Sequence, residues 1–297
     1  MISEARKNEI CKAALDVLSE YDLFVLPIDP RVVAEQESIA IKGFSPSSEG
    51  ISGFLMKSGD DFIIAYSERL RNRGYENFTV AHELGHYFLD GHIEEILGDG
   101  NTHFSISGFT SNNKFEREAD LFASELLMPG KIIEPHLKET EIGLSSVKRI
   151  AAICSTSLTA SALKYASLTP DHVIVVLSTG ESIQWMFTSD SLSEYRTPKE
   201  KLKPLPIHSA TRAFNQNRDN IELARENGKE ISLQEWLAFA PDEAAYEEVI
   251  GLGSYGYSLT IISLEEIAES YSENTYSDKN EDNWIERMEK GVFRSKK

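Results

Sequence analysis

The segment His82–His86, which reads HELGH, carries three side chains whose types and spacing could do chemistry. On a helix, residues four apart lie one turn apart on the same face, so the imidazoles of His82 and His86 could bind a single Zn²⁺ ion. Zinc lowers the pKa of a bound water from about 15.7 to about 7, and the neighbouring Glu83 could take its proton and pass it to a leaving amine. The pattern predicts metal-assisted hydrolysis of a peptide bond, although an ordinary helix with two exposed histidines also fits it.

A catalytic zinc needs a third protein ligand, and the segment Asn113–Pro129 offers one. Glu116 and Asp120 are four residues apart, so Glu116 could complete a His₂Glu site while Asp120 orients a ligand histidine through its free ring nitrogen. In an alternative interpretation Asn113 is an N-cap and Glu116 is its capping partner. Glu118 is a weaker ligand candidate because it points about 200° around the helix from Glu116.

Two helices must position these side chains. A buried stripe with i, i+3, i+4, i+7 spacing predicts a first helix of about three turns, ended by Asp90–Gly91; its members are Ala81, Leu84, Gly85 and Phe88. The same spacing predicts a second helix, ended by Pro129–Gly130; its stripe is Ala119, Phe122, Ala123 and Leu126. A loop rich in Gly, Ser and Asn is predicted over residues 98–113.

We expect an α+β fold whose first domain, residues 1–130, is an HExxH zincin-like metallopeptidase domain. Apolar spacing predicts a helix over residues 4–21, and two apolar runs joined by SGD predict a hairpin over residues 51–67. Residues 131–168 predict short helices with a helix-turn-helix-like spacing.

Residues 169–269 predict a smaller C-terminal α+β domain, and residues 270–297 a polar tail. The domain should begin with a hairpin, HVIVVLS and SIQWMFTS, contain a helix near residues 233–239 and end in the strand YGYSLTIISL. GLGSYG, residues 251–256, formally matches a dinucleotide-binding motif, but a strand-like segment follows it, so we interpret it as a turn.

The amino-acid composition limits the kinds of partner that the protein can bind and the cellular compartment in which we expect it. A net charge of -18 repels phosphate, and the last of the short helices offers mainly Lys164, so direct nucleic-acid binding is disfavoured. Only Cys11 and Cys154 are present, which predicts buried thiols instead of a disulfide framework. With no signal-peptide core and no stretch of about 18 apolar residues, we expect a cytoplasmic protein without a membrane span.

FTVAHELGHYFL together with EREADLFASELLMP resembles the ImmA/IrrE family of zinc-dependent metallo-endopeptidases, whose motif couples an AHELGH helix to an E-x-x-A-[DN]-x-F-A-x-x-LLMP helix. The resemblance is firm over residues 51–129 and looser to residue 167. It implies one Zn²⁺ per chain, with His82, His86 and Glu116 as its ligands. It also implies that Glu83 is the general base and that Asp120 lies beside a ligand histidine.

The resemblance further implies that a cytoplasmic protease cleaves a regulatory protein, a helix-turn-helix transcriptional repressor, and that the C-terminal strands form a GAF-like sheet. The alternative is a metal-containing regulator that binds a repressor or another partner protein without cutting it. The residue that stabilises the oxyanion is left unassigned. His92, His103 and Tyr87 are near in sequence, and for each we expect a structural role.

Overall fold

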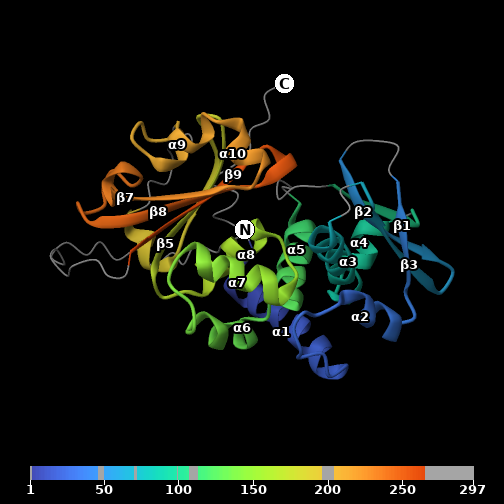
Figure 1. Cartoon of the computed structure of the whole chain (residues 1–297). Coiled ribbons are helices and arrows are strands. Elements are labelled where there is room, and N and C mark those ends of the chain that lie inside the picture. The colour runs from blue at the N-terminus through green and yellow to red at the C-terminus, as the bar shows by residue number, and fades with distance from the viewer. Residues whose placement is uncertain are drawn as a thin grey trace. The chain divides into compact units, whose positions relative to one another are not determined.

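The structure, a computed structural model (Figure 1), describes residues 2–45, 50–69, 72–98, 100–106, 113–195 and 204–264. The chain divides into two compact units. Unit 1 comprises the residues up to 136 together with 150–160, and unit 2 comprises 137–149 together with the residues from 161 onward. The division passes through helices α7 (Leu144–Cys154) and α8 (Leu158–Leu168), both of which the sequence predicts as helical.

Unit 1 contains a four-stranded sheet in the order β1-β3-β2-β4. Its strands are β1 (Ala40–Phe44), β2 (Ile51–Ser58), β3 (Asp61–Ser67) and β4 (Thr102–Ile106). β2 and β3 form the predicted hairpin, in which Ser58 is opposite Asp61 and Gly59 supplies the positive φ of 68° that a tight turn needs. β1 runs parallel to β3, and β4 runs antiparallel to β2.

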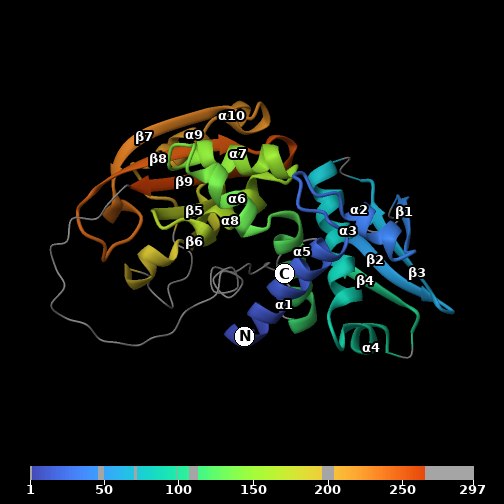
Figure 2. The same cartoon turned by 90° about the horizontal axis from the view of Figure 1, so that it is seen from below.

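Helices cover this sheet in successive layers, seen from two directions in Figures 1 and 2. The helices are α1 (Glu4–Glu20), α2 (Pro30–Gln36), α3 (Arg73–Phe88), α4 (His92–Leu97), α5 (Lys114–Leu127) and α6 (Gly130–Leu137). α3 packs against β2 and β3 on one side and α5 on the other, and α1 packs on α5. Because α3 is enclosed, every residue from Thr79 to His86 is buried, and the predicted narrow buried stripe is wrong.

The predicted N-terminal helix is confirmed as α1, with Ser3 as its N-cap. Several short elements of unit 1, in contrast, are not predicted from the sequence. The predicted loop over residues 98–113 instead contains β4, whose polar composition hides a strand that pairs with β2. α2, β1 and α4 were also not predicted, each being at most seven residues long.

Unit 2 contains a five-stranded sheet in the order β6-β5-β9-β8-β7, with every pair antiparallel. Its strands are β5 (His172–Thr179), β6 (Ser182–Thr188), β7 (Glu226–Ser232), β8 (Ala244–Gly251) and β9 (Ser258–Leu264). The hairpin β5–β6 and the strand β9 confirm the prediction. β5 and β9 are interior strands buried on both faces, which explains their continuous apolar runs. β7 and β8 were not predicted.

Short helices accompany the second sheet: α9 (Ala210–Asn215), α10 (Arg218–Glu222), and the 3-10 turns η1 (Asp190–Tyr195), η2 (Leu233–Glu235) and η3 (Gly253–Tyr255). α9 and α10 pack on β8. The helix predicted near residues 233–239 is limited to the single turn η2, because the chain then turns through Pro241 into β8. GLGSYG connects β8 to β9 as a turn before a strand.

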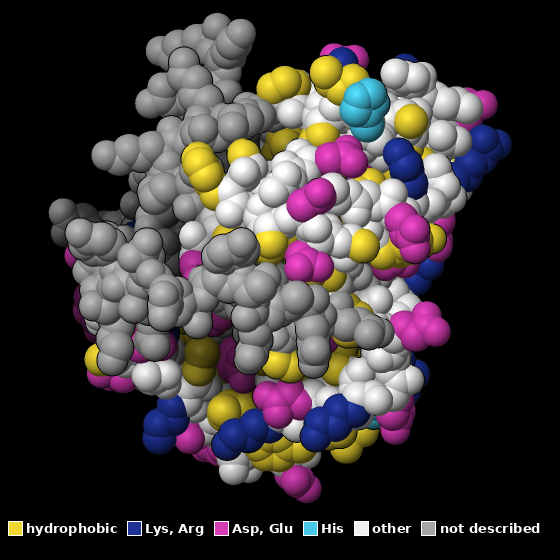
Figure 3. All heavy atoms as spheres, turned by 90° about the vertical axis from the view of Figure 1, so that its left-hand side faces the viewer, with side chains coloured by type: hydrophobic (Ala, Val, Ile, Leu, Met, Phe, Trp, Pro, Cys, Tyr) yellow, Lys and Arg dark blue, Asp and Glu magenta, His cyan; other side chains and the backbone are white. Residues whose placement is uncertain are grey.

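The mixed α+β class is confirmed, and the predicted burial of the two thiols is confirmed for one of them. Trp185 and Trp236 are buried, as is the thiol of Cys154, whereas Cys11 is only half-buried. On the face drawn in Figure 3, acidic and basic side chains are interspersed among hydrophobic and other polar ones. Across the described residues no helix combines the length and hydropathy that a bilayer crossing requires. The predicted tail, residues 270–297, lies outside the described residues.

A candidate metal centre

A close crossing of α3 and α5 brings the two sequence motifs together. α3 begins after Asn72, whose side chain accepts a hydrogen bond from the amide of Tyr75. A Cβ at Gly85 would lie 3.0 Å from Cα of Ala119 and 3.1 Å from its carbonyl oxygen, so any other residue would require the backbone of Ala119 to shift by a few tenths of an ångström. The helices therefore meet beside the histidines of one motif and the carboxylates of the other.

The side chains of His82, His86 and Glu116 converge at this crossing. The two Nε2 atoms of the histidines are 3.2 Å apart, and the carboxylate oxygens of Glu116 lie 3.4 Å from Nε2 of His82 and 3.4 Å from Nε2 of His86. All three residues can offer ligand atoms within 4.8 Å of one another.

These separations allow a test of whether a zinc ion fits. Two donors about 2.0–2.1 Å from a tetrahedral ion are about 3.3–3.4 Å apart. The distances between the three donor groups, 3.2, 3.4 and 3.4 Å, match this spacing. The set of two imidazoles and one carboxylate is also one that zinc accepts, so the residues present fit the ion.

The contacts of Asn113 and Glu116 bear on the two interpretations of this segment. Asn113 does cap α5, since its side chain accepts a hydrogen bond from the amide of Phe115. The carboxylate of Glu116, however, is directed at the histidines. Burial opposes its charge, but hydrogen bonds with His103, His82 and His86 outweigh burial and hold the pKa of Glu116 well below its usual range.

Glu83 is fully buried beside the cluster, and neither of its carboxylate oxygens makes a well-formed hydrogen bond among the described residues, although the hydroxyl of Ser105 is a polar neighbour that lowers its pKa. Burial raises the pKa of Glu83 to about 7, against the opposing influence of His82. A buried carboxylate with no well-formed hydrogen bond is unfavourable in a folded protein, so this one is suited to interact with a further polar group such as a water or a cation.

Asp120 lies where the sequence places it, behind His82. Its carboxylate oxygen is 2.8 Å from Nδ1 of His82, the ring nitrogen that faces away from the cluster. Burial lowers the pKa of His82, but its contacts with Asp120 and Glu116 outweigh this and raise the pKa. Burial raises the pKa of the Asp120 carboxyl. The contact fixes the orientation of the His82 ring.

Two histidines with an expected structural role also contact the cluster. His103, on β4, lies with Nε2 2.8 Å from a carboxylate oxygen of Glu116. His92, at the start of α4, lies with Nδ1 3.1 Å from Nδ1 of His86. Burial lowers the pKa of His92 and lowers that of His86 to about 3. The alternation of His103 and Ser105 along β4 is the signal that could have placed His103, had the strand been recognised.

The remaining candidates lie elsewhere. The carboxylate of Glu118 contacts His92 and Arg6 instead of the three converging side chains. The hydroxyl of Tyr87 donates a hydrogen bond to Glu37.

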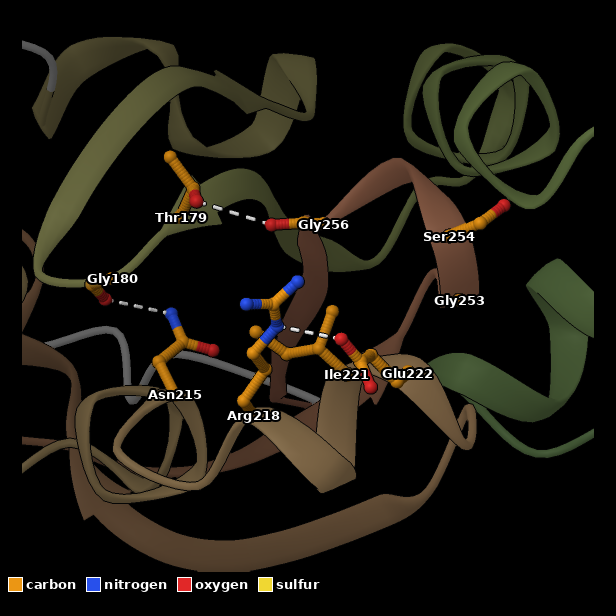
Figure 4. Close-up of a pocket in the computed structure, with 9 residues that line it drawn as sticks. All are labelled: Thr179, Gly180, Asn215, Arg218, Ile221, Glu222, Gly253, Ser254 and Gly256. Carbon is orange, nitrogen blue, oxygen red and sulfur yellow. Dashed lines mark hydrogen bonds and ion pairs between the residues drawn. The ribbon is translucent and has the colours of Figure 1, made fainter.

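Unit 2 contains a pocket of about 350 Å³ between the β5–β6 turn, α10 and the turn after β8 (Figure 4). Its charged side chains, Arg218 and Glu222, form an ion pair of 2.6 Å with each other. These two charges satisfy one another, whereas the donor group of His82, His86 and Glu116 lies in unit 1.

Comparisons with known proteins agree with this location. The model of the Peptidase M78 family, described as the IrrE N-terminal-like domain, matches residues 34–160. Metallopeptidase ImmA of Bacillus subtilis (strain 168) is 35% identical over 83 residues, which are 27% of this chain and 43% of ImmA. The match thus spans less than half of that relative.

A solved structure, a Mycobacterium tuberculosis transcriptional regulator, is similar in fold, with a TM-score of 0.50 and 12% identity over 87% of this chain and 75% of the other. At this identity the likeness concerns the fold alone. The family match instead covers both motifs, His82–His86 on α3 and Glu116 on α5. Residues 34–160, which carry both motifs, are thus similar to the Peptidase M78 family and in part to Metallopeptidase ImmA.

Proposed function

We propose that the chain is a zinc-dependent endopeptidase that hydrolyses a peptide bond in a regulatory protein, a helix-turn-helix transcriptional repressor. One observation carries the proposal: three zinc-type donors, from His82, His86 and Glu116, converge beside the buried carboxylate of Glu83, whose oxygens make no well-formed hydrogen bond among the described residues. The match of residues 34–160 to the Peptidase M78 family supports a protease, and the repressor substrate is part of the proposal.

The chemistry divides between the ion and the chain. A zinc ion held by the three ligands supplies Lewis acidity and lowers the pKa of the attacking water. Glu83 accepts a proton from that water as the water oxygen bonds to the peptide carbonyl carbon. Glu83 then delivers the proton to the amide nitrogen as the C–N bond breaks, which leaves a carboxylate and an amine.

Neighbouring residues hold the ligands in place. Asp120 orients His82 across 2.8 Å, and His103 holds one oxygen of Glu116 across 2.8 Å. Each contact holds one ligand side chain in a fixed orientation, so we expect each to strengthen the binding of the metal.

We expect the substrate backbone to pair with β4. Within the described residues β4 is the last strand of its sheet, paired with β2, and it carries His103 to the cluster. An extended peptide that paired with β4 would continue the sheet and present its backbone beside the cluster. This supports a substrate cut within an extended segment of its chain.

The test compares wild type with Glu83→Gln. Both proteins are incubated with helix-turn-helix proteins encoded beside the gene, and the products are identified by mass spectrometry. We expect wild type to cut one of them at a defined bond and Glu83→Gln, with its zinc retained, to cut none. Equal cutting by both proteins would contradict the role of Glu83. Zinc in both with cutting by neither would favour the non-cleaving regulator.

A further inference from the structure

Behind His86, three further side chains continue a line of hydrogen bonds away from the cluster. Nδ1 of His86 is 3.1 Å from Nδ1 of His92, and Nε2 of His92 is 3.2 Å from Oε2 of Glu118. Arg6 donates to the same carboxylate oxygen from Nε at 2.9 Å and from Nη2 at 2.7 Å. The side chains of His86, His92 and Glu118 are all fully buried. We call these four residues the Arg6–His86 chain.

The contacts of Glu118 determine which atom donates in each hydrogen bond of the Arg6–His86 chain. The carboxylate of Glu118 accepts two bonds from the guanidinium of Arg6, and the ammonium of Lys114 lies 3.3 Å from its other oxygen. A carboxylate in that setting is an acceptor only. Nε2 of His92 must therefore carry the hydrogen between them.

The proton on His92 sets the proton on its neighbour. A neutral imidazole protonated at Nε2 has its lone pair on Nδ1. Nδ1 of His92 is thus the acceptor across the 3.1 Å contact, and Nδ1 of His86 is the donor. His86 is left with a lone pair on Nε2, the atom that lies 3.2 Å from Nε2 of His82 and 3.4 Å from Glu116.

We propose that the Arg6–His86 chain fixes the tautomer of His86, so that Nε2 carries the lone pair a metal ion needs. His92, Glu118 and Arg6 are then positioning residues of the centre. The inference rests on the proposed function for the identity of the ligands, and it gives His86 the counterpart of what Asp120 does for His82 in a single contact.

The Arg6–His86 chain also connects three helices to the site. Arg6 is on α1, Glu118 on α5 and His92 on α4. Arg6 precedes residues 34–160, the part of the chain that the family model matches, so this support reaches outside the matched domain. The paired charges of Arg6 and Glu118 matter because an unpaired buried carboxylate would be strongly unfavourable.

The first test needs no metal. Nitrogen-15 NMR of the metal-free full chain, with labelled histidines, reports which ring nitrogen carries the proton. We expect His86 to be protonated at Nδ1 and His92 at Nε2. A metal-free wild type in which His86 is protonated at Nε2 would overturn the inference.

The second test compares two replacements of His92. His92→Leu fills similar space but offers no acceptor, whereas His92→Gln offers a side-chain oxygen to Nδ1 of His86. Zinc affinity, measured by competition with a chelator, should fall about 10–100-fold in His92→Leu, and His92→Gln should recover most of that loss. Equal losses in the two variants would show that packing alone is affected and would overturn the inference.

A matched pair of carboxylate variants extends this test and replaces it where His92→Leu does not fold. Glu118→Gln should lower zinc affinity, since an amide no longer fixes the proton on His92. Glu37→Gln is its control, because Glu37 accepts hydrogen bonds from the hydroxyls of Tyr21 and Tyr87 and touches no histidine of the centre. Equal affinity in the two variants would contradict the inference.

The two readouts keep the inference separate from the proposed function. A wild type that binds no zinc but shows the expected tautomers would overturn the proposed function and uphold the assignment of the protons. A wild type that binds zinc but whose metal-free form has His86 protonated at Nε2 would overturn the inference alone.

Discussion

Glu83 and Glu116 are carboxylates on neighbouring helices that lie in opposite surroundings. Glu116 contacts His82, His86 and His103, while neither oxygen of Glu83 makes a well-formed hydrogen bond among the described residues. A carboxylate fixed by several donors suits a permanent ligand, and an unbound one suits proton transfer. The contacts thus support the proposed roles of Glu116 as ligand and Glu83 as base, which the HExxH spacing also favours.

The ligand role of Glu116 can be tested against a second glutamate of the same helix. Glu116→Gln replaces the anionic ligand by a neutral amide, so we expect the purified variant to lose most of its zinc. Glu125→Gln is the control, because Glu125 accepts a hydrogen bond from the amide of Gly130 at the other end of α5. Elemental analysis gives the metal content of each, and full zinc occupancy in Glu116→Gln would contradict the ligand role.

The side chains of this site differ in how far the sequence could predict them. His82 and His86 with Glu116 and Asp120 are two i, i+4 pairs, so helical geometry alone places each pair on one face. His92 and His103 contact the cluster only because α4 and β4 fold back on α3, and no local spacing encodes that contact.

Helix packing determines whether those pairs meet, and Gly85 is the residue on which the crossing depends. We expect Gly85→Ala to lower the melting temperature and the zinc affinity. Alanine is the better helix former by about 1 kcal/mol, but its Cβ would press on backbone atoms of Ala119, and such overpacking costs about 1–3 kcal/mol. Thermal unfolding and chelator competition measure the two effects. A variant with a higher melting temperature and unchanged zinc affinity would contradict this prediction, because it would show that α3 and α5 can move apart enough to accept the Cβ.

Elements with strong local signals were predictable, and those held by partners were not. The hairpin β2–β3 has two apolar runs around a glycine turn, and α1 has a complete helical stripe. β4 is short and polar and is a strand only because β2 pairs with it. α2 is an instructive omission, since Asp29 as N-cap and Pro30 at the first turn are start signals that the sequence displays.

At the scale of the whole chain, we expect metal binding in unit 1 and none in unit 2. Removal of zinc with a chelator should speed amide hydrogen exchange in α3 and α5, because a ligand bound only to the native state stabilises it by about 4 kcal/mol at a thousand times its dissociation constant. β5 and β9 of unit 2 bear no ligand and should exchange at unchanged rates. Mass spectrometry of peptic fragments reports each segment, and a change confined to β5 and β9 would contradict this assignment.

The most direct test of the account is the anomalous X-ray difference map of the purified protein, crystallised without added metal and measured at the zinc edge. We predict one peak per chain, about 2.0–2.2 Å from Nε2 of His82, Nε2 of His86 and a carboxylate oxygen of Glu116. A map with no peak at these three side chains, or with its peak elsewhere in the chain, would contradict the account.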